Sequence, residues 1–350
     1  MNNFKKRLEN TSPTLISLIA RVDELRGEWT GGATLNPIVL DRLQKSSLIT
    51  SAGASTRIEG SKLSDPEVEK IMKNLTVTKM TSRDVQEVRG YYETLNFVYN
   101  NYADLPLTEN TILYLHTQLL QYSDKDNYHK GQYKHQENRV EMLDEIGKLI
   151  EVLFETTPAL LTPKAMNELI QNTNNSLGSN TQHRLLVIAN FVVEFLKIHP
   201  FIDGNGRLSR ILTNMLLLQA GYTYVPYISL ERLIEVSKGD YYVALRRSQA
   251  TFDTDSESIT DWTLYFLKIL EQQALQATSL LKRSNLEIDL SPAQQKVWEV
   301  FADNGIVSPK AIMSQSGVPR GTLAQAIEKL LQLKMIERIG LGRSTRYRKL

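Results

Sequence analysis

Residues 199–210 read His-Pro-Phe-Ile-Asp-Gly-Asn-Gly-Arg-Leu-Ser-Arg and lie between two apolar segments. Residues 185–198 are almost wholly apolar, over a length that favours a buried helix rather than a strand. Pro200 cannot continue that helix and disfavours helical geometry at His199. Apolar residues then recur with helical spacing over 208–218, which predicts a second helix with one apolar face. The pattern therefore predicts a loop between two packed helices.

The side chains of this loop suit the binding of a polyphosphate. Glycines let backbone N–H groups approach an anion closely, and the N-terminus of the following helix favours negative charge. Arg207 and Arg210 are three residues apart, so both lie on one helix face and offer forked donors to phosphate. Asp203 is a side chain that Mg²⁺ prefers, and His199 titrates near neutral pH. The alternative is a plain turn with Asp203 as helix N-cap, but a turn needs neither the histidine nor the arginines.

The same residues match the Fic family signature, HPFx[D/E]GN[G/K]RxxR, at every fixed position, and the chain is identified as a member of that family by this resemblance. The resemblance implies a mainly α fold, a Fic-type helical bundle with a small β-hairpin flap. It implies an adenylyltransferase that uses ATP and Mg²⁺ and moves AMP onto a Ser, Thr or Tyr hydroxyl of a target protein or of the chain itself. Positioning and charge neutralisation, which this chemistry needs most, are what the loop offers.

By position, the resemblance gives the signature residues their roles. His199 is the general base that takes the proton of the attacking hydroxyl, and Asp203 holds Mg²⁺ between the α- and β-phosphates. A tyrosine pair downstream matches a family segment that shapes the nucleotide pocket, although such a pair in a helix is more often packing. The nucleotide-binding residues in the resemblance are Gly204, Asn205, Gly206, Arg207, Arg210, Tyr241 and Tyr242.

Residues 55–60, Ser-Thr-Arg-Ile-Glu-Gly, resemble the family's inhibitory motif, [S/T]xxxE[G/N], with Ser55, Glu59 and Gly60 at its fixed positions. Taken alone, Gly60 is an ordinary helix C-cap, and an acidic residue beside it is mildly unfavourable. The resemblance implies that Glu59 pairs with Arg210, keeps the γ-phosphate out of place and represses the enzyme. We therefore expect a Glu59–Arg210 salt bridge. Some relatives use this glutamate to orient water and remove AMP, so a deAMPylating role also stays open.

The region between the two motifs resembles the part of the family that carries the target-docking flap. The resemblance rests on residues 131–134, on Val140 and on the pair at 157–158. The family more often has arginine where Lys134 stands and proline where the chain has threonine at 157. We place the flap hairpin near residues 148–154. The alternative is a surface hairpin with no partner.

The C-terminal segment is basic on a slightly acidic body. Residues 288–350 hold ten Lys/Arg against five Asp/Glu, which leaves 31 against 34 in the rest of the chain. Helix-start signals at residues 291, 308 and 319, followed by a hairpin around Gly342, predict a winged helix-turn-helix. Such a module binds DNA or a protein partner, and both readings stay open. The candidate DNA contacts are Arg320, Thr322 and Gln325 for the major groove, and Arg343, Arg346 and Arg348 for phosphates.

Composition sets the remaining limits. The 350 residues include no cysteine, which excludes disulfides and thiolate chemistry. The N-terminus lacks a signal-peptide pattern and no apolar run reaches transmembrane length, so we expect a cytoplasmic protein without a membrane partner. The resemblance leaves a homodimer open. We expect an N-terminal helical region over 1–100, with the inhibitory helix ending near Gly60, a Fic core over 101–283 and a winged helix over 288–350, with a linker at 284–285.

Two function classes follow. The first is an autoinhibited protein adenylyltransferase. The alternative is a nucleotide-sensing, DNA-binding transcriptional regulator in which the Fic core is a scaffold. The intact signature favours the first, because His199 has no role in a passive sensor. Relatives also transfer phosphate, UMP or phosphocholine, but Gly206 and the two arginines favour AMP.

Overall fold

The computed structural model describes residues 3–9, 11–32, 37–73, 83–143, 149–179, 181–288, 290–301, 306–333, 335–339 and 345–349. These residues form two compact units, Met1–Thr278 and Ser279–Leu350. Helices dominate both units, which confirms the expected fold class. None of the described helices combines the length and the apolar character needed to cross a membrane.

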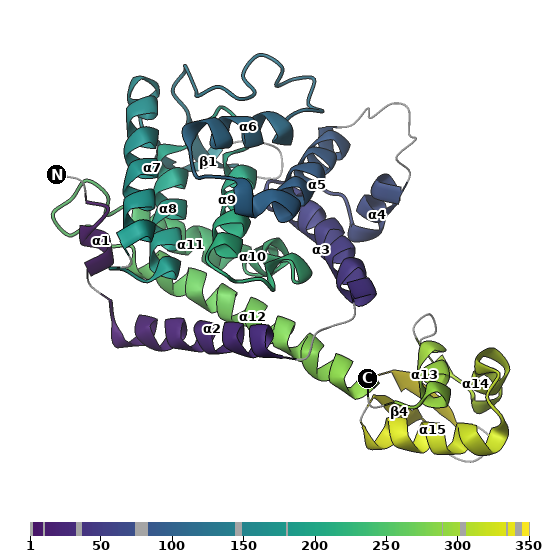
Figure 1. The fold of residues 1–350 in the computed structure, drawn as a ribbon. Coiled ribbons are helices and arrows are strands. Elements are labelled where there is room, and N and C mark those ends of the chain that lie inside the picture. The colour runs from purple at the N-terminus through teal and green to yellow at the C-terminus, as the bar shows by residue number, and fades with distance from the viewer. Residues whose placement is uncertain are drawn as a thin grey trace. The chain divides into compact units, whose positions relative to one another are not determined.

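The first unit is a bundle of helices with one small hairpin (Figure 1). Its helices are α1 (Lys6–Glu9), α2 (Pro13–Gly31), α3 (Pro37–Ile58), α4 (Asp65–Lys73), α5 (Arg83–Asn101), α6 (Glu109–Leu119), α7 (Thr162–Ser179), α8 (Arg184–Ile198), α9 (Asn205–Gln219), α10 (Leu230–Val236), α11 (Lys238–Gln249) and the first part of α12 (Thr260–Ile288), which continues past Thr278 into the second unit. Short 3₁₀ turns are Tyr102–Asp104, Ala159–Leu161 and Val225–Tyr227. Strands β1 (Arg139–Leu143) and β2 (Leu149–Glu155) form an antiparallel hairpin.

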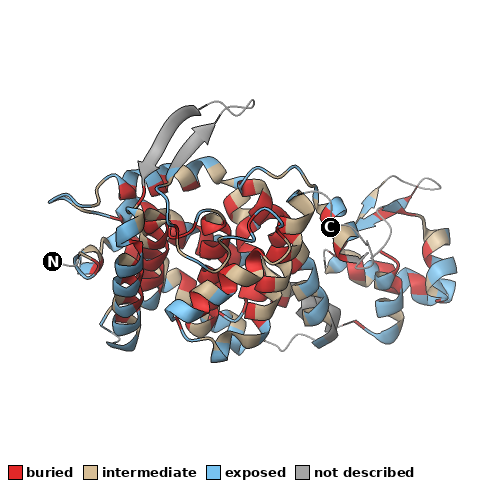
Figure 2. Cartoon of the chain, turned by 90° about the horizontal axis from the view of Figure 1, so that it is seen from above, coloured by how far each residue is buried: buried red, intermediate tan, exposed pale blue. Residues whose placement is uncertain are grey.

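Helices α8 and α9 are buried along nearly their whole length. Buried residues gather inside this unit, and exposed ones lie around them (Figure 2). The apolar run predicted a buried helix here, and the structure confirms it. Helix α8 packs against α7 and α9, so its C-terminal end is held on two sides. The chain leaves the helix at His199, as Pro200 requires, and starts α9 after a short loop. That loop is therefore bounded by the ends of two buried helices.

Helix α3 brings the second motif to the same place. It packs against α5 and α10 and also contacts α9. Its end is capped as expected, because Gly60 adopts a positive φ of 106° and the Ser61 N–H donates to the Thr56 carbonyl at 3.1 Å. Residues 55–59 thus face the start of α9 from a helix that belongs to another part of the sequence.

Two boundary predictions need correction. The linker expected at residues 284–285 is helical, because α12 runs without a break to Ile288. Neither glycine nor proline occurs in it, so Ser and Asn alone do not stop the helix. The hairpin expected near 148–154 starts earlier, since β1 begins at Arg139 and pairs with Glu155. Residues 149–154 lie in β2 as expected, while Lys148 lies outside the described residues.

The second unit has the elements expected of a winged helix. Helices α13 (Pro292–Glu299), α14 (Pro309–Ser316) and α15 (Arg320–Gln332) precede a sheet of β3 (Ile306–Val307), β4 (Ile336–Ile339) and β5 (Arg346–Lys349) in the order β3-β5-β4. Ser291 caps α13 in a capping box with Gln294, and Ser308 caps α14. Tyr347 of β5 pairs with both neighbouring strands and closes a small core under the helices.

Candidate active site

His199 is held in a strained but well-fixed position at the end of α8. Its backbone is left-handed, with φ 51° and ψ 60°, and its N–H still donates to the Phe195 carbonyl at 2.9 Å. The ring Nδ1 lies 3.3 Å from the Leu196 carbonyl oxygen. A carbonyl oxygen only accepts, so the proton belongs on Nδ1 and the lone pair on Nε2. Burial lowers the pKa of His199 to about 4, so the ring is neutral at neutral pH.

Lys134 fixes the chain on both sides of this histidine. Its side chain is buried, and its ammonium donates to the Ile198 carbonyl at 3.1 Å, to Asn138 Oδ1 at 2.7 Å and to Thr156 Oγ1 at 2.8 Å. Its backbone N–H donates to the Pro200 carbonyl at 2.8 Å. Burial lowers the pKa of Lys134 to about 8. The sequence placed Lys134 in the flap region and gave no sign of this clamp.

Asn205 closes the loop on itself. Its Oδ1 accepts from the Phe201 N–H at 2.9 Å, and its Nδ2 donates to the Phe201 carbonyl at 2.7 Å. The side chain is buried, so both of its polar atoms are used inside the loop. In this conformation Asn205 therefore ties the loop together, and its contact with a nucleotide stays a prediction. Gly204, with φ 82°, precedes α9 and leaves the first backbone N–H groups of the helix as the cradle.

His116 supports the loop from α6, and sequence analysis missed it. Its ring stacks on Phe201, with centroids 3.7 Å apart and planes at 12°. Its Nδ1 accepts from the Gly131 N–H at 2.8 Å, which puts the proton on Nε2, and Nε2 lies 3.0 Å from the Asp203 carbonyl oxygen. Burial lowers the pKa of His116 to about 4, so it stays a neutral donor to the loop.

Asp203 and Arg207 form a charged layer beside the loop. Asp203 Oδ1 accepts from the Gly204 N–H at 2.7 Å and from Arg207 Nη2 at 2.9 Å, while Oδ2 accepts from Arg83 Nη2 at 3.1 Å. Arg207 Nη1 also lies 3.2 Å from Glu87. Burial opposes ionisation of Asp203, but Arg207, the Gly204 N–H and Arg83 outweigh it and lower its pKa. The carboxylate is therefore charged at neutral pH.

This carboxylate fits a magnesium ion that is shared with phosphate oxygens. Mg²⁺ in phosphate-transfer sites takes one or two carboxylates and completes its shell with substrate and water. Asp203 supplies one charged carboxylate, and its Oδ2 accepts from Arg83, a half-exposed side chain that also pairs with Glu87 through Nε at 2.6 Å. Within the described ranges no group of three or more acidic or histidine side chains could hold a metal ion.

Glu59 occupies the mouth of the anion cradle. Its Oε1 accepts from Arg210 Nη2 at 2.8 Å, so the structure contains the expected Glu59–Arg210 salt bridge. Ser55 holds the same guanidinium, through Oγ to Nε at 2.9 Å and through its carbonyl to Nη2 at 3.0 Å. A Cβ atom on Gly206 would lie only 2.3 Å from Glu59 Oε1. The carboxylate thus rests directly on the backbone of the loop.

Both signature arginines keep unused donors in this layer. The Nε of Arg207 and the Nη1 of Arg210 are buried and have no hydrogen-bond partner among the residues that the structure describes. Buried donors without acceptors are costly, so they mark a place for an anion. The site can therefore take phosphate oxygens at two guanidiniums and a helix N-terminus, next to a neutral histidine.

Comparison with known proteins agrees with this geometry. Residues 106–217 match the model of the Fic/DOC family. The chain contains a Fic/DOC domain. A Fido domain-containing protein from Dictyostelium discoideum is 39% identical over 75 residues, which are 21% of this chain and 52% of that protein. A protein named protein adenylyltransferase Fic, from Drosophila grimshawi, is 52% identical over 48 residues, 14% of this chain and 10% of that protein. The matched segment therefore spans about half the length of the Dictyostelium protein and a tenth of the length of the Drosophila protein.

Solved structures extend the likeness beyond the Fic domain. A Fic family protein from Desulfovibrio desulfuricans G20 aligns over 98% of this chain and 98% of its own, with a TM-score of 0.60 at 23% identity. Fic-1 from C. elegans aligns over 77% of this chain and 73% of its own, with a TM-score of 0.62 at 20% identity. At such identities the likeness shows the fold. Residues 299–350 match a model described as the C-terminal domain of a DIP2311-like transcriptional regulator.

The tyrosine pair of the Fic domain lies partly at the site. Tyr241 is buried in an aromatic cluster with Trp262 and Tyr265, at centroid distances of 5.6 and 5.9 Å. Burial raises its pKa to about 12, although the nearby Arg210 opposes this. Tyr242 packs on Tyr241 at 5.2 Å, and burial together with Glu59 raises its pKa. Tyr241 therefore backs the Arg210 guanidinium as part of the core, and a contact of either ring with a nucleotide stays a prediction.

The candidate DNA contacts are placed only in part. Arg320, Thr322 and Gln325 lie on the exposed face of α15, as a recognition helix requires. Arg346 is exposed on β5. Arg348 is also exposed, but it pairs with Glu337 on the neighbouring strand, which reduces its value for a phosphate. Arg343, at the expected wing tip, lies outside the described residues.

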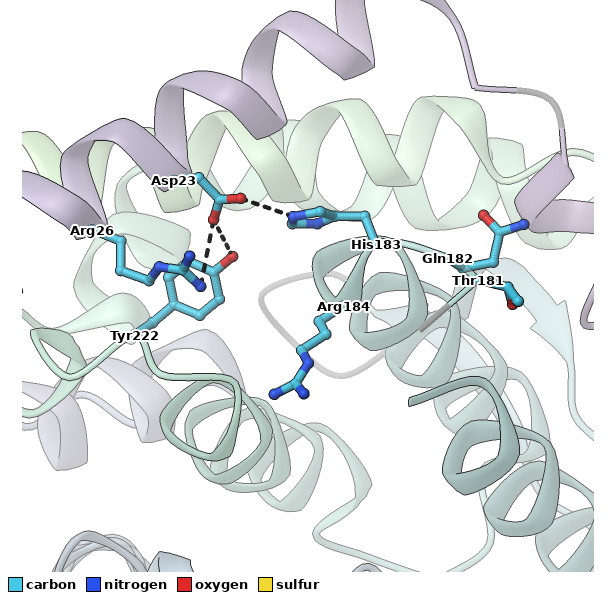
Figure 3. A pocket seen from close by; sticks show the side chains of 7 residues that line it. All are labelled: Asp23, Arg26, Thr181, Gln182, His183, Arg184 and Tyr222. Atoms are coloured by element: carbon cyan, nitrogen blue, oxygen red, sulfur yellow. Dashed lines mark hydrogen bonds and ion pairs between the residues drawn. The ribbon is translucent and has the colours of Figure 1, made fainter. Parts of the chain in front are cut away.

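A polar pocket at the start of α8 is separate from the signature loop. It has a volume of about 370 Å³, and Asp23 lines it with the carboxylate directed toward His183 and Tyr222 (Figure 3). Asp23 accepts from His183 Nε2 at 2.9 Å and from the Tyr222 hydroxyl at 2.7 Å, and Arg26 lies 3.7 Å away. These contacts satisfy the carboxylate and fasten α2 to the bundle. We assign this pocket a structural role.

Proposed function

We propose that the protein is an autoinhibited protein adenylyltransferase. The observation that carries the proposal is the juxtaposition at the signature loop: a neutral His199 with its lone pair on Nε2, two arginines with unused donors, and Glu59 lying on the cradle they form. The match to relatives named protein adenylyltransferase supports the same reaction class. The resting state is the one in which Glu59 and Arg210 are paired.

In the proposed reaction a hydroxyl of the target attacks the α-phosphorus of ATP. The new oxygen–phosphorus bond forms as the bond to the β-phosphate breaks, so AMP is attached and pyrophosphate leaves. His199 takes the hydroxyl proton on Nε2, because Nδ1 already carries a proton and the free lone pair is on Nε2. Arg207 and the N-terminal N–H groups of α9 hold the phosphates. Asp203 is the residue that would hold Mg²⁺, which supplies charge neutralisation when bound.

Glu59 blocks this reaction in the proposed resting state. Its carboxylate satisfies Arg210 and lies on Gly206, so a γ-phosphate at that position meets a negative charge in place of a free guanidinium. Like charges at a few ångströms repel by several kcal/mol in a partly buried site, by order of magnitude. Loss of the carboxylate leaves Arg210 in place, because Ser55 still accepts two of its hydrogen bonds.

The test is intact-mass analysis after incubation with ATP and Mg²⁺. Four proteins are compared: wild type, Glu59→Gly, Glu59→Gly/His199→Ala, and Glu67→Gly as a control for loss of an exposed acid on α4. We expect an AMP adduct of about 329 Da in Glu59→Gly, little in wild type and in the control, and none in the double variant. An equal amount of AMP adduct in wild type and Glu59→Gly would refute the proposed inhibitory role of Glu59. The absence of an adduct in all four proteins would refute the proposed transferase activity.

A second function is favoured by the C-terminal match to a transcriptional regulator. In this alternative the second unit binds DNA and the Fic domain senses nucleotide. Fluorescence anisotropy of the full chain with a pool of random DNA duplexes tests it, at 50 and 200 mM salt. DNA binding predicts a steep loss of affinity with salt and a weaker affinity in Arg320→Ala, whereas Glu328→Ala on the same helix should not weaken it.

A further inference from the structure

A second pocket lies against the helix that carries Glu59. It has a volume of about 590 Å³ and is bounded by α3, α10 and α12 within the first unit. This volume is in the range of sites for small organic molecules. Helix α3 contributes Leu43, Ser46, Ser47 and Thr50, about two to four turns before Glu59. Any molecule bound here touches the inhibitory helix directly.

The lining of this pocket defines the chemistry of its ligand. Apolar groups from α3 and α10 are mixed with serine and threonine hydroxyls. Arg232 is the charged side chain of the lining, and Glu235 neutralises it at 2.8 Å. Ser47 is 6% exposed, yet its hydroxyl has no hydrogen-bond partner among the described residues. A buried hydroxyl that lines a pocket and lacks a partner calls for a polar atom from a ligand. The pocket therefore suits an uncharged molecule with an apolar body and a hydrogen-bonding group.

A chain of polar contacts links the pocket to the inhibitory salt bridge. Ser229, which lines the pocket, accepts from Ser51 of α3 at 2.8 Å and donates to the buried Glu231 at 3.2 Å. The hydroxyl of Tyr91 donates to the same carboxylate at 2.8 Å and also interacts with the side chain of Ser55. Ser55 in turn holds Arg210, the partner of Glu59. The position of α3 in the pocket wall is therefore tied to the position of the guanidinium.

An ion pair ties the two pocket walls together near the motif. Arg57, two residues before Glu59, binds Glu235 of α10 through Nε at 2.6 Å and Nη2 at 3.1 Å. The pocket therefore has its present shape when Arg57 holds α3 against α10 and Glu59 is paired with Arg210. A ligand that binds this shape better than any other must favour it, by linkage.

We propose that this pocket is an effector site for a small uncharged molecule, and that its occupancy holds Glu59 in the inhibitory position. The proposal rests on the proposed function for its consequence, repression of AMP transfer. The proposal also states that filling the pocket fixes the end of α3. This effect does not depend on catalysis and is tested separately.

The experiment uses the absence of cysteine in the chain. Ser46 lines the pocket and is exposed. In the 350-residue chain, the thiolate of Ser46→Cys attacks benzyl methanethiosulfonate, forms a mixed disulfide with its benzylthio group and releases methanesulfinate; dithiothreitol reduces this disulfide and removes the group. Lys45→Cys, exposed on the same helix but outside the pocket lining, is the matched control. Hydrogen–deuterium exchange of the backbone amides of residues 55–60 is the primary measurement.

We expect exchange of residues 55–60 to slow at least about threefold in benzylated Ser46→Cys, to recover with dithiothreitol and to stay unchanged in benzylated Lys45→Cys, since tethering gives the group a high effective concentration. Unchanged or faster exchange in benzylated Ser46→Cys, or equal slowing in both proteins, overturns the proposal. Self-modification is then measured with and without Glu59→Gly. The benzyl group should lower it only where Glu59 is present, and lowering in both backgrounds also counts against the proposal. An inactive Glu59→Gly protein would refute the proposed function while the exchange result still decides the pocket.

Discussion

Replacement of Lys134 by methionine tests how the backbone on both sides of His199 is held. Methionine keeps the length and apolar stem of lysine but removes the ammonium, leaving the Ile198 carbonyl, Asn138 Oδ1 and Thr156 Oγ1 without their donor. Hydrogen bonds to a charged group contribute about 1.5–3 kcal/mol each. Against them stands the cost of burying the charge, which the lowered pKa of about 8 puts at about 3 kcal/mol. We therefore expect Lys134→Met to lower the free energy of unfolding by about 3 kcal/mol at pH 7.

The sign of the pH dependence gives this prediction a second, sharper readout. The folded-state pKa of Lys134, about 8, lies below the ordinary lysine pKa of 10.5, so between these values the unfolded chain binds more protons than the folded one. Stability of the wild type therefore rises with pH through this window, by up to about 1.4 kcal/mol per pH unit from this group. The deficit of Lys134→Met should widen accordingly from pH 8 to 9.5.

The assay is guanidinium unfolding of both proteins at pH 7.0, 8.0, 9.0 and 9.5, followed by tryptophan fluorescence. Lys45→Met, a lysine on the surface of α3, is the control and should change neither the stability nor its slope with pH by more than about 0.5 kcal/mol. Equal stability of wild type and Lys134→Met at pH 7, or parallel pH curves, would refute the reasoning that a buried, charged lysine clamps the loop.

Three further predictions concern the site itself. Because burial lowers the pKa of His199 to about 4, initial rates of Glu59→Gly self-modification should stay nearly flat from about pH 8 to 5 and fall with a midpoint near pH 4; a midpoint near 6.5 would contradict this. Glu59→Gln keeps an acceptor for Arg210 but loses the charge, so its adduct yield by intact mass should lie between those of wild type and Glu59→Gly; a yield at either extreme would show that charge or contact alone acts. His116→Ala loses the ring on Phe201 and a hydrogen bond to the loop, so urea unfolding should show a loss of about 2–4 kcal/mol, and a loss below about 1 kcal/mol would argue against a supporting role.

The sequence identified the residues whose roles depend on local pattern. The apolar run, Pro200 and the glycines predict the helix–loop–helix at the site, and the structure has it. The salt bridge between Glu59 and Arg210 joins residues 151 apart, and only the resemblance between two motifs and one family led to it. Local periodicity says nothing about such a contact.

The supporting residues could not be found in this way, for physical reasons. His116 meets the Asp203 carbonyl across 87 residues, and its position on α6 reads as an ordinary helical residue. Lys134 is charged, and buried lysines are rare enough that a surface position is the natural expectation. For Asn205, the sequence pattern could not decide between two partners. An amide in a turn can bind either a ligand or the loop backbone, and here it binds the backbone of Phe201.

The contact of Glu59 with Gly206 has a genetic consequence. A methyl group at position 206 would need the space that the carboxylate oxygen occupies, 2.3 Å away, while the side chain of Glu59 is long enough to swing out. The proposed repression would therefore depend on two codons that are far apart in the gene, and a single missense change in either would remove the same contact. We expect a selection for gain of activity to recover changes at both positions. For the same reason, a lineage that acquires a larger residue at 206 loses the advantage of keeping glutamate at 59.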